Sequence, residues 1–249
     1  MRAASVVLVA LARLAAPRRA DETCVFLLAT PGSGSSTMAE LLARAGVEMS
    51  GENWGAFVGL ARFAEKMRRT AKQPRSNAHD AAAWRAVFDA ADVGAATDAL
   101  ARAVLNPRGT PAFGFKEIRY GRPPNVGTFR DDVAFLETLC ARPRVVLHMR
   151  RNATREFHSA VVGDRPAVAR DSRQQRECFA SYAGDAPGPC GPPARGAFVH
   201  YLEDYIDRTP RHAALWDYVG LAEPARDDVH LSSKQGTRSR RATSRRGSR

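Results

Sequence analysis

The fold of this chain is decided by the stretch Cys24-Val25-Phe26-Leu27-Leu28-Ala29-Thr30-Pro31-Gly32-Ser33-Gly34-Ser35-Ser36-Thr37. Its apolar first half predicts a short buried strand, and the amphipathic segment after the turn predicts a helix that ends at Gly46. Gly32 and Gly34 let the turn fold tightly, so that successive backbone N–H groups converge at the helix N-terminus, which favours an anion. We expect this turn to bind a nucleotide-like anion; a Gly/Ser turn that merely joins strand and helix is the alternative.

The turn differs from the phosphate loop of nucleoside triphosphatases, which reads Gly-x-x-x-x-Gly-Lys-Ser/Thr. It contains no Lys, and its first Gly does not stand at the required spacing. Backbone amides and the hydroxyls of Ser35, Ser36 and Thr37 remain as donors, without an evident ligand for Mg²⁺. The turn therefore indicates an anion site that works without a metal.

Apolar strands and amphipathic helices alternate along the rest of the chain. Strands are expected at 112–118, 144–149 and 198–201, and helices at 54–70, 81–105, 131–140, 153–162 and from Glu203 to Gly220. The segments 47–55 and 163–196 are predicted to be connections. This alternation predicts an α/β fold, a three-layer domain of the P-loop type with a central parallel sheet. Ligand groups in such a sheet gather beyond the carboxyl ends of the strands.

Length and charge are consistent with one such domain. The chain has 249 residues, and we place the domain at 21–232. Seven of the twelve excess positive charges lie in 234–249, so the remainder carries only five. The segment 233–249 is rich in Ser, Thr, Gly and Arg and is predicted to be a disordered basic tail. Nucleic acid is a disfavoured partner because the tail lacks interleaved aromatic residues, although RNA or an anionic membrane is the alternative role for it.

The first twenty residues form a separate segment. An apolar run from Ala3 to Ala12, interrupted by Arg13 and resumed at Leu14, is too short to span a bilayer, which takes about 20 apolar residues. We expect a secretory signal, an organellar transit peptide or a weak membrane anchor. The secretory pathway and the Golgi are the favoured location, with an organelle as the alternative.

Four cysteines allow three disulfide pairings. Cys178 and Cys190 bracket a Pro/Gly-rich loop and are predicted to pair if the compartment is oxidising. Cys24 and Cys140 are expected instead to be small buried apolar residues. No spacing of Cys and His suggests zinc.

A second phosphate motif follows the strand predicted at 144–149. Arg151, Asn152 and Ala153 lead from this strand into a helix, with Ser159 eight residues after Arg151. A guanidinium and a hydroxyl at this spacing are able to bind one phosphate. The motif resembles the 3'-phosphate motif of sulfotransferases that use 3'-phosphoadenosine 5'-phosphosulfate (PAPS), and residues 31–37 resemble their 5'-phosphosulfate loop. Similarity extends over about Cys24 to Leu221 and includes the segments 114–119, 199–205 and 216–221.

The resemblance, which is greatest to the carbohydrate-modifying Golgi-type branch, implies transfer of a sulfuryl group from PAPS to a hydroxyl or amine, without a metal. The expected acceptor is a carbohydrate. The 5' end of PAPS would be bound by Gly32, Ser33, Gly34, Ser35, Ser36 and Thr37, and its 3'-phosphate by Arg151 and Ser159. Loops at 50–53, 121–127 and 163–196 would line the acceptor site.

One departure from the family pattern concerns catalysis. Members carry Lys or Arg at the position of Gly32, and here Lys116 is the candidate to supply that charge. A general base would be Glu52, which we prefer, or Glu117. The alternatives are a catalytically weak PAPS-binding homologue and a P-loop nucleotide kinase or hydrolase. His148, inside a strand, is expected to be a hydrogen-bonded core residue, and His158 is expected to be structural.

Overall fold

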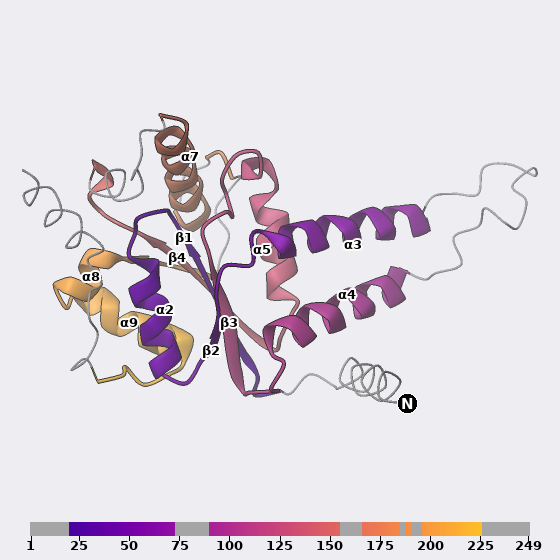
Figure 1. Ribbon diagram of the computed structural model, residues 1–249, viewed down its shortest axis with the longest axis horizontal. Helices are drawn as coiled ribbons and strands as arrows, with labels where there is room; N and C mark the ends of the chain where they lie inside the picture. Colours follow the sequence, from indigo (N-terminus) through magenta and orange to yellow (C-terminus); the bar gives the residue numbers. More distant parts are fainter. Residues whose placement is uncertain (1–19, 73–89, 155–165, 185–187, 191–195, 226–249) are drawn as a thin grey trace, which may run out of the picture.

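The computed structural model describes residues 20–72, 90–154, 166–184, 188–190 and 196–225. Within these ranges, five strands form one parallel sheet in the order β2-β3-β1-β4-β5. The strands are β1 (Thr23–Ala29), β2 (Glu48–Ser50), β3 (Ala112–Glu117), β4 (Arg142–Met149) and β5 (Ala197–Tyr201). Helices cover both faces of the sheet (Figure 1), so the predicted three-layer α/β fold is confirmed.

The two helical layers bury different faces of the sheet. One layer contains α2 (Ser35–Arg44), α8 (Leu202–Ile206) and α9 (Pro210–Val219). The other contains α3 (Ala56–Lys72), α5 (Phe129–Glu137) and α7 (Pro166–Ala183), with α4 (Ala90–Leu105) packed against α3. Figure 1 shows α3 and α4 side by side, extending away from the sheet.

The central strand β1 contributes to both cores, which explains its unbroken apolar sequence. Val25 and Leu27 pack with Met38 and Trp216 on the α2 face, whereas Phe26 and its alternate neighbours pack on the α3 face. A parallel strand buried on both faces has no need of a polar alternate position. The turn after β1 is therefore fixed at the middle of the sheet.

Two predictions about the elements are wrong. The segment 163–196 is not mostly loop, because α7 occupies Pro166–Ala183, and the connection 47–55 contains the short strand β2. The first half of α7 buries Ser172 and Gln175 rather than large apolar residues, so apolar periodicity is weak there. On α3, Phe63 is 56% exposed.

Several predicted segments lie outside the described residues. They include 1–19, most of the helix predicted at 153–162, the first part of that predicted at 81–105, and the basic tail from 226 onwards. None of the described helices combines the length and the apolar character that a membrane crossing requires. The N-terminal segment and the tail stay predictions.

All four cysteines are paired in the structure. Cys178 bonds to Cys190, as predicted, and Cys24 bonds to Cys140, which corrects the expectation that these two are separate apolar residues. Cys24 and Cys140 are buried, as expected. They come together because Cys24 lies opposite Pro143 in the register of β1 and β4, so the turn before β4 runs past the start of β1. Sequence spacing does not reveal this neighbourhood.

We expect the double substitution Cys178→Ser with Cys190→Ser to lower the free energy of unfolding by about 3 kcal/mol, because the bridge closes a short loop in the unfolded chain. Urea unfolding followed by tryptophan fluorescence measures this loss. Reducing agent should cost the wild type further stability through Cys24 and Cys140. A double variant as stable as the oxidised wild type would contradict the prediction.

Candidate functional site

The site begins with the phosphate loop, residues 30–37, between β1 and α2. Gly32 and Gly34 have φ angles of 77° and 84°, in the left-handed region that favours glycine. Gly34 is the N-cap of α2, whose first turn holds no acidic residue and receives no side-chain cap. Ser36 is exposed on this turn. The helix N-terminus therefore offers backbone amides and a hydroxyl to an anion.

Gly34 is also required by its packing. A Cβ atom at this position would lie 2.8 Å from Cδ1 of Leu202, at the start of α8. Leu202, which directly follows β5, thus packs against the loop. The loop is held between the central strand, α2 and α8.

Two buried hydroxyls lie inside the loop. The Oγ1 of Thr30 and the Oγ of Ser33 are buried and have no hydrogen-bond partner within the described part of the chain. Buried hydroxyls are normally satisfied, and here they flank the backbone that would receive the phosphosulfate end of PAPS. With the amides of α2 they form a donor set whose chemistry fits such a group.

The end of β3 brings Lys116 to the same side of the sheet as the loop. In the register of β1 and β3, Lys116 pairs with Leu27 and Glu117 pairs with Leu28. Leu27 packs against α2, whereas Leu28 belongs to the core under α3, so Lys116 and Glu117 point to opposite faces. Lys116 therefore emerges on the face that carries the phosphate loop and α2.

Glu52, which follows β2, joins this charged group. Its Oε1 accepts a hydrogen bond from Lys116 Nζ, and its Oε2 lies 3.2 Å from Arg119 Nη1. Partial burial raises the pKa of Glu52, but the hydrogen bonds and charges of Lys116 and Arg119 outweigh burial and leave the pKa below its ordinary value. Glu52 is 27% exposed and ionised at neutral pH, so it faces solvent as a carboxylate.

Glu117, the other candidate base, is fully buried. Its Oε2 accepts from Gly55 N at 2.9 Å, and its Oε1 accepts from Ile118 N at 2.8 Å and from Arg119 Nη1 at 2.6 Å. The Arg119 guanidinium in turn stacks 4.1 Å from the ring of Trp54, which is 79% exposed. The contacts of Glu117 suit a carboxylate that fixes the chain around 52–55 better than one that reaches a substrate.

Arg151 lies two residues beyond the end of β4, next to the loop. Its Nη2 donates to Asp204 Oδ1 at 2.5 Å, its backbone N donates to Glu203 at 2.8 Å, and its guanidinium stacks 4.5 Å from the ring of Tyr201. Asp204 is buried and also accepts from Tyr201 N and Thr209. Arg151 is thus held in place while half of its side chain is exposed. Ser159 lies outside the described residues.

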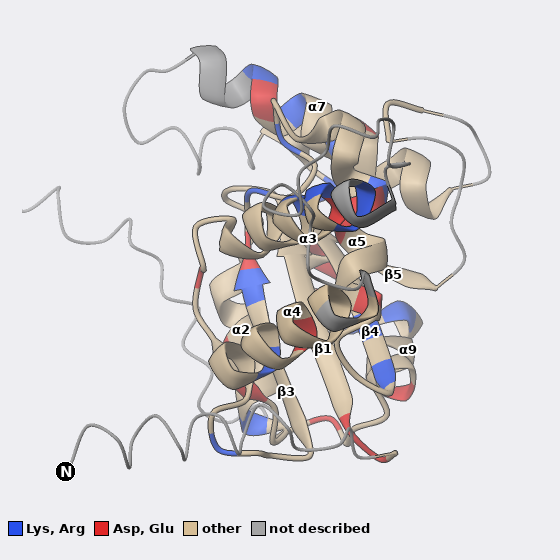
Figure 2. Cartoon of the chain, turned by 90° about the vertical axis from the view of Figure 1, so that its right-hand side faces the viewer, with Lys and Arg blue, Asp and Glu red and all other residues tan. Residues whose placement is uncertain are grey.

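Lys, Arg, Asp and Glu residues lie along the helices of the layer that contains α3, α5 and α7 (Figure 2). From this layer comes a residue that sequence reasoning missed, Gln175 of α7. Its Nε2 donates to the carbonyl oxygens of Ala29, Ile118 and Tyr120 at 3.2, 3.1 and 2.7 Å. Gln175 thereby fixes the end of β1 to the chain that follows β3. The sequence contains a signal for this part of the helix. Four residues have the i, i+3, i+4, i+7 spacing of one helix face: Gln175, Cys178, Phe179 and Tyr182.

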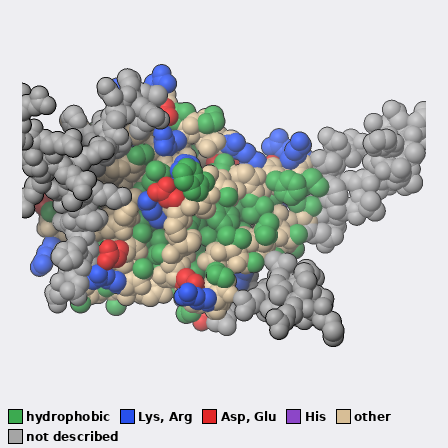
Figure 3. All heavy atoms as spheres, viewed as in Figure 1, with side chains coloured by type: hydrophobic (Ala, Val, Ile, Leu, Met, Phe, Trp, Pro, Cys, Tyr) green, Lys and Arg blue, Asp and Glu red, His purple; other side chains and the backbone are tan. Residues whose placement is uncertain are grey.

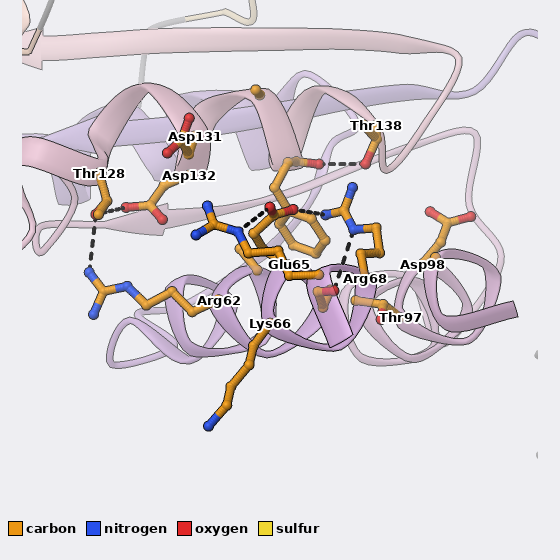
Figure 4. A pocket seen from close by; sticks show the side chains of 16 residues that line it. Arg62, Glu65, Lys66, Arg68, Thr97, Asp98, Thr128, Asp131, Asp132 and Thr138 are labelled. Carbon is orange, nitrogen blue, oxygen red and sulfur yellow. Dashed lines mark hydrogen bonds and ion pairs between the residues drawn. The ribbon is translucent and has the colours of Figure 1, made fainter. Parts of the chain in front are cut away.

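A cavity of about 940 Å³ lies elsewhere, between α3, α4 and α5 (Figure 4). At one end Arg62 donates to Thr128 at 3.0 Å, and Thr128 donates to Asp132 at 3.1 Å. Burial raises the pKa of Asp132 to about 6. None of the predicted site residues lines this cavity, so it is separate from the phosphate loop.

The outer surface of α3 and α4 is apolar in part. Figure 3 shows apolar side chains gathered on this face, and Phe63, Leu100 and Val104 are the exposed large ones on these two helices. An apolar patch of this kind is typical of a contact surface. The structure contains no second molecule that would identify the contact.

Comparison of the chain with known protein families and with curated proteins finds no match. Among the described residues, no group of three or more His, Cys, Asp and Glu is arranged to hold a metal ion.

Proposed function

We propose that this chain is a sulfotransferase that transfers a sulfuryl group from PAPS to a hydroxyl or amine, with a carbohydrate hydroxyl as the acceptor and the Golgi as its location. The observation that carries the proposal is the placement of the two phosphate motifs on adjacent parallel strands. Ala29 lies opposite His148 in the register of β1 and β4, and Thr30 N donates to the His148 carbonyl at 3.0 Å. The loop and Arg151 therefore lie at one edge of the sheet, as a donor with phosphates at both ends requires.

In this proposal the loop binds the 5'-phosphosulfate through the amides of α2 and the hydroxyls of Ser33, Ser35, Ser36 and Thr37. Arg151 binds the 3'-phosphate through the N–H groups that Asp204 leaves available. Both contacts position the donor and exclude water from it.

The transfer step needs a cation and a base. The acceptor oxygen forms a bond to sulfur while the bond from sulfur to the bridging oxygen breaks, which leaves adenosine 3',5'-bisphosphate. Lys116, on the same face as the loop, stabilises the charge that develops on the bridging oxygen. Glu52 takes the acceptor's proton, and its exposure makes it the better of the two candidate bases.

Two alternative functions make different predictions. A nucleotide kinase or hydrolase would require Mg²⁺ and a loop Lys, which this loop lacks. The other alternative is a catalytically weak PAPS-binding homologue, which is favoured by Gly32. The loop has no cation at this position, and a Lys there would have to adopt a strained φ of 77°. The nucleotide that binds distinguishes a kinase or hydrolase from a sulfotransferase. The rate of sulfuryl transfer distinguishes a catalytically weak homologue from an active enzyme.

We expect Arg151→Ala to weaken the binding of adenosine 3',5'-bisphosphate by about 10- to 100-fold, because a charged hydrogen-bond donor to phosphate is lost. Titration calorimetry in the presence of EDTA measures the affinity. Arg108→Ala is the matched control, since Arg108 is 81% exposed and pairs with Glu48 on β2 instead. Equal affinities of the wild type and Arg151→Ala, or tighter binding of ATP with Mg²⁺, would overturn the proposed function.

A further inference from the structure

Three buried histidines form a line of hydrogen bonds beneath the phosphate loop. His148 Nε2 lies 3.0 Å from the carbonyl oxygen of Ser33, and His148 Nδ1 lies 3.1 Å from Nδ1 of His200. His200 Nε2 lies 3.1 Å from Nδ1 of His212, and the indole N–H of Trp216 donates to His212 Nε2 at 3.2 Å. The exposed fraction of each imidazole residue is 2% or less, so the line is closed to solvent along its length.

The positions of the protons in this line follow from its end at Ser33. A carbonyl oxygen only accepts, so His148 carries its proton on Nε2. A neutral His148 then accepts at Nδ1, which requires the proton of His200 on Nδ1 and that of His212 on Nδ1 as well. The indole of Trp216, which only donates, matches the remaining acceptor of a neutral His212. One tautomer of each histidine therefore satisfies all four hydrogen bonds.

The surroundings keep the inner two histidines neutral. Burial lowers the pKa of His148 to about 4, and the groups that face it are Glu203 and Asp204, which oppose this shift, and Arg150, which adds to it. Burial also lowers the pKa of His200 to about 2, and the charged or titratable groups that add to this shift are His148, His212, Arg211 and Arg151.

The outer end of the line lies at a small cavity. His212 Nε2 lies 3.3 Å from Oε1 of Glu223, and a cavity of about 350 Å³ beside them is also lined by Arg208 and Thr209. The Tyr205 ring packs on His212 from α8. If His212 takes up a proton on Nε2, this N–H donates to Glu223 and the hydrogen bond from Trp216 is lost, while the inner hydrogen bonds keep their direction because they are set from Ser33.

His148 contacts both ends of the tight turn in the phosphate loop. Its backbone carbonyl accepts from Thr30 N at 3.0 Å, and its Nε2 donates to the Ser33 carbonyl at 3.0 Å. We propose that His148 is a positioning residue of the phosphate loop, locked as the Nε2–H tautomer by His200, His212 and Trp216. Because an Nε2–H tautomer fixes the Ser33 carbonyl, it also fixes the direction of the amides that follow. The consequence for donor affinity rests on the proposed function; the lock itself does not.

The tautomers are read directly by long-range ¹H–¹⁵N NMR of wild-type protein labelled at histidine nitrogens, at pH 7.5. We expect neutral rings protonated at Nε2 for His148 and at Nδ1 for His200 and His212. Signals are assigned by substituting each histidine in turn. An Nδ1–H tautomer or an imidazolium at His148 would overturn the proposal, whatever the protein binds.

The matched variants are His148→Asn and His148→Gln, which each lose one hydrogen bond of the line. The Asn side chain retains the contact with His200 and is too short to donate to Ser33, whereas the Gln amide reaches Ser33 and gives up His200. We expect similar losses of stability in both. Hydrogen exchange of the peptide containing residues 30–37 should accelerate about tenfold in the Asn variant alone, as for the loss of one hydrogen bond.

Affinity for adenosine 3',5'-bisphosphate should follow the same pattern, falling about tenfold in His148→Asn and staying within about threefold of wild type in His148→Gln. Equal exchange rates of the loop in the two variants would overturn the positioning role. A wild type that binds no adenosine 3',5'-bisphosphate would overturn the proposed function, while the tautomers and the exchange rates would still decide the inference.

Discussion

Replacement of Lys116 by Ala should lower the rate of sulfuryl transfer by about a hundredfold to a thousandfold, the usual cost of removing one donor aimed at transition-state charge. The loop itself contains no Lys or Arg, and Gly32 stands where the sulfotransferases that the sequence resembles carry one. Lys116 is the described basic residue that the register of β1 and β3 places on the α2 face beside the loop. Its loss would leave the bridging oxygen with amide and hydroxyl donors only.

The same substitution should barely change the affinity for adenosine 3',5'-bisphosphate. Lys116 acts on charge that develops as the S–O bond breaks, and this charge is a property of the transition state. Arg119 Nη1 also lies 3.2 Å from Glu52 Oε2, so the Glu52 carboxylate keeps a cationic partner when Lys116 is replaced. The expected signature is therefore a fall in kcat with the product affinity retained.

The rate is measured with labelled PAPS and a panel of glycans, phenols and lipids, since the acceptor is to be found in the same experiment. Lys66→Ala, on α3 at the separate cavity, is the matched control and should transfer at the wild-type rate. Lys116→Arg keeps the charge and should recover part of the activity. If Lys116→Ala and Lys66→Ala transfer sulfate equally fast, Lys116 has no role in the step, and the weak homologue becomes the better description.

The sequence was sufficient for four of the five strands and for the turn between β1 and α2 because their signals are local. An unbroken apolar run, a Gly/Ser turn and an amphipathic helix specify β1 and α2 within the same 23 residues, and Gly220, with φ 73°, ends α9 as predicted. The carboxyl ends of parallel strands then meet at one edge, whatever the intervening sequence. For this reason the loop and Arg151 follow the ends of adjacent strands at one edge of the sheet.

The contacts that complete the site could not be read in the same way, because they join residues far apart in sequence. Gln175 and Ala29 are 146 positions apart, and His148 and Ser33 are 115 apart. A buried polar residue looks like a surface residue in sequence, so only the second half of α7 has a helical signal, and its first half, with Ser172 and Gln175, does not. His148 was expected to be hydrogen-bonded in the core, which is confirmed, but its partners only appear once β4 and β5 are paired at His148 and His200.

The buried histidines make the free energy of unfolding depend on pH in a range where carboxylates contribute little. In the folded protein the pKa values of His148 and His200 are about 4 and about 2, against about 6.5 in the unfolded chain. Below pH 6.5 the unfolded chain binds more protons than the folded one, so stability falls as the pH falls. Well above pH 6.5 both states are neutral at these two positions, so His148 and His200 no longer change the stability.

Between pH 7 and pH 4 the two histidines should together cost about 6 kcal/mol of stability, by linkage at about 1.4 kcal/mol for each pKa unit. Asp132 acts in the opposite direction, since its folded pKa of about 6 lies above its unfolded value and the folded state takes up the extra proton. Protonation of Asp132 stabilises the folded state by about 2 kcal/mol, so the net loss in the free energy of unfolding is about 4 kcal/mol. The loss begins near pH 6.5, above the range in which ordinary carboxylates titrate.

Urea unfolding at half-unit steps of pH, followed by tryptophan fluorescence, tests this balance. Asp132→Asn removes the opposing group and should steepen the loss to about 6 kcal/mol, without moving the pH at which it begins. A wild type whose stability is constant down to pH 5 would mean that the histidines are not sealed in the neutral state. His148 and His200 would then bind protons in the folded protein at the same pH as in the unfolded chain, and a single set of neutral tautomers could not hold Ser33 in place.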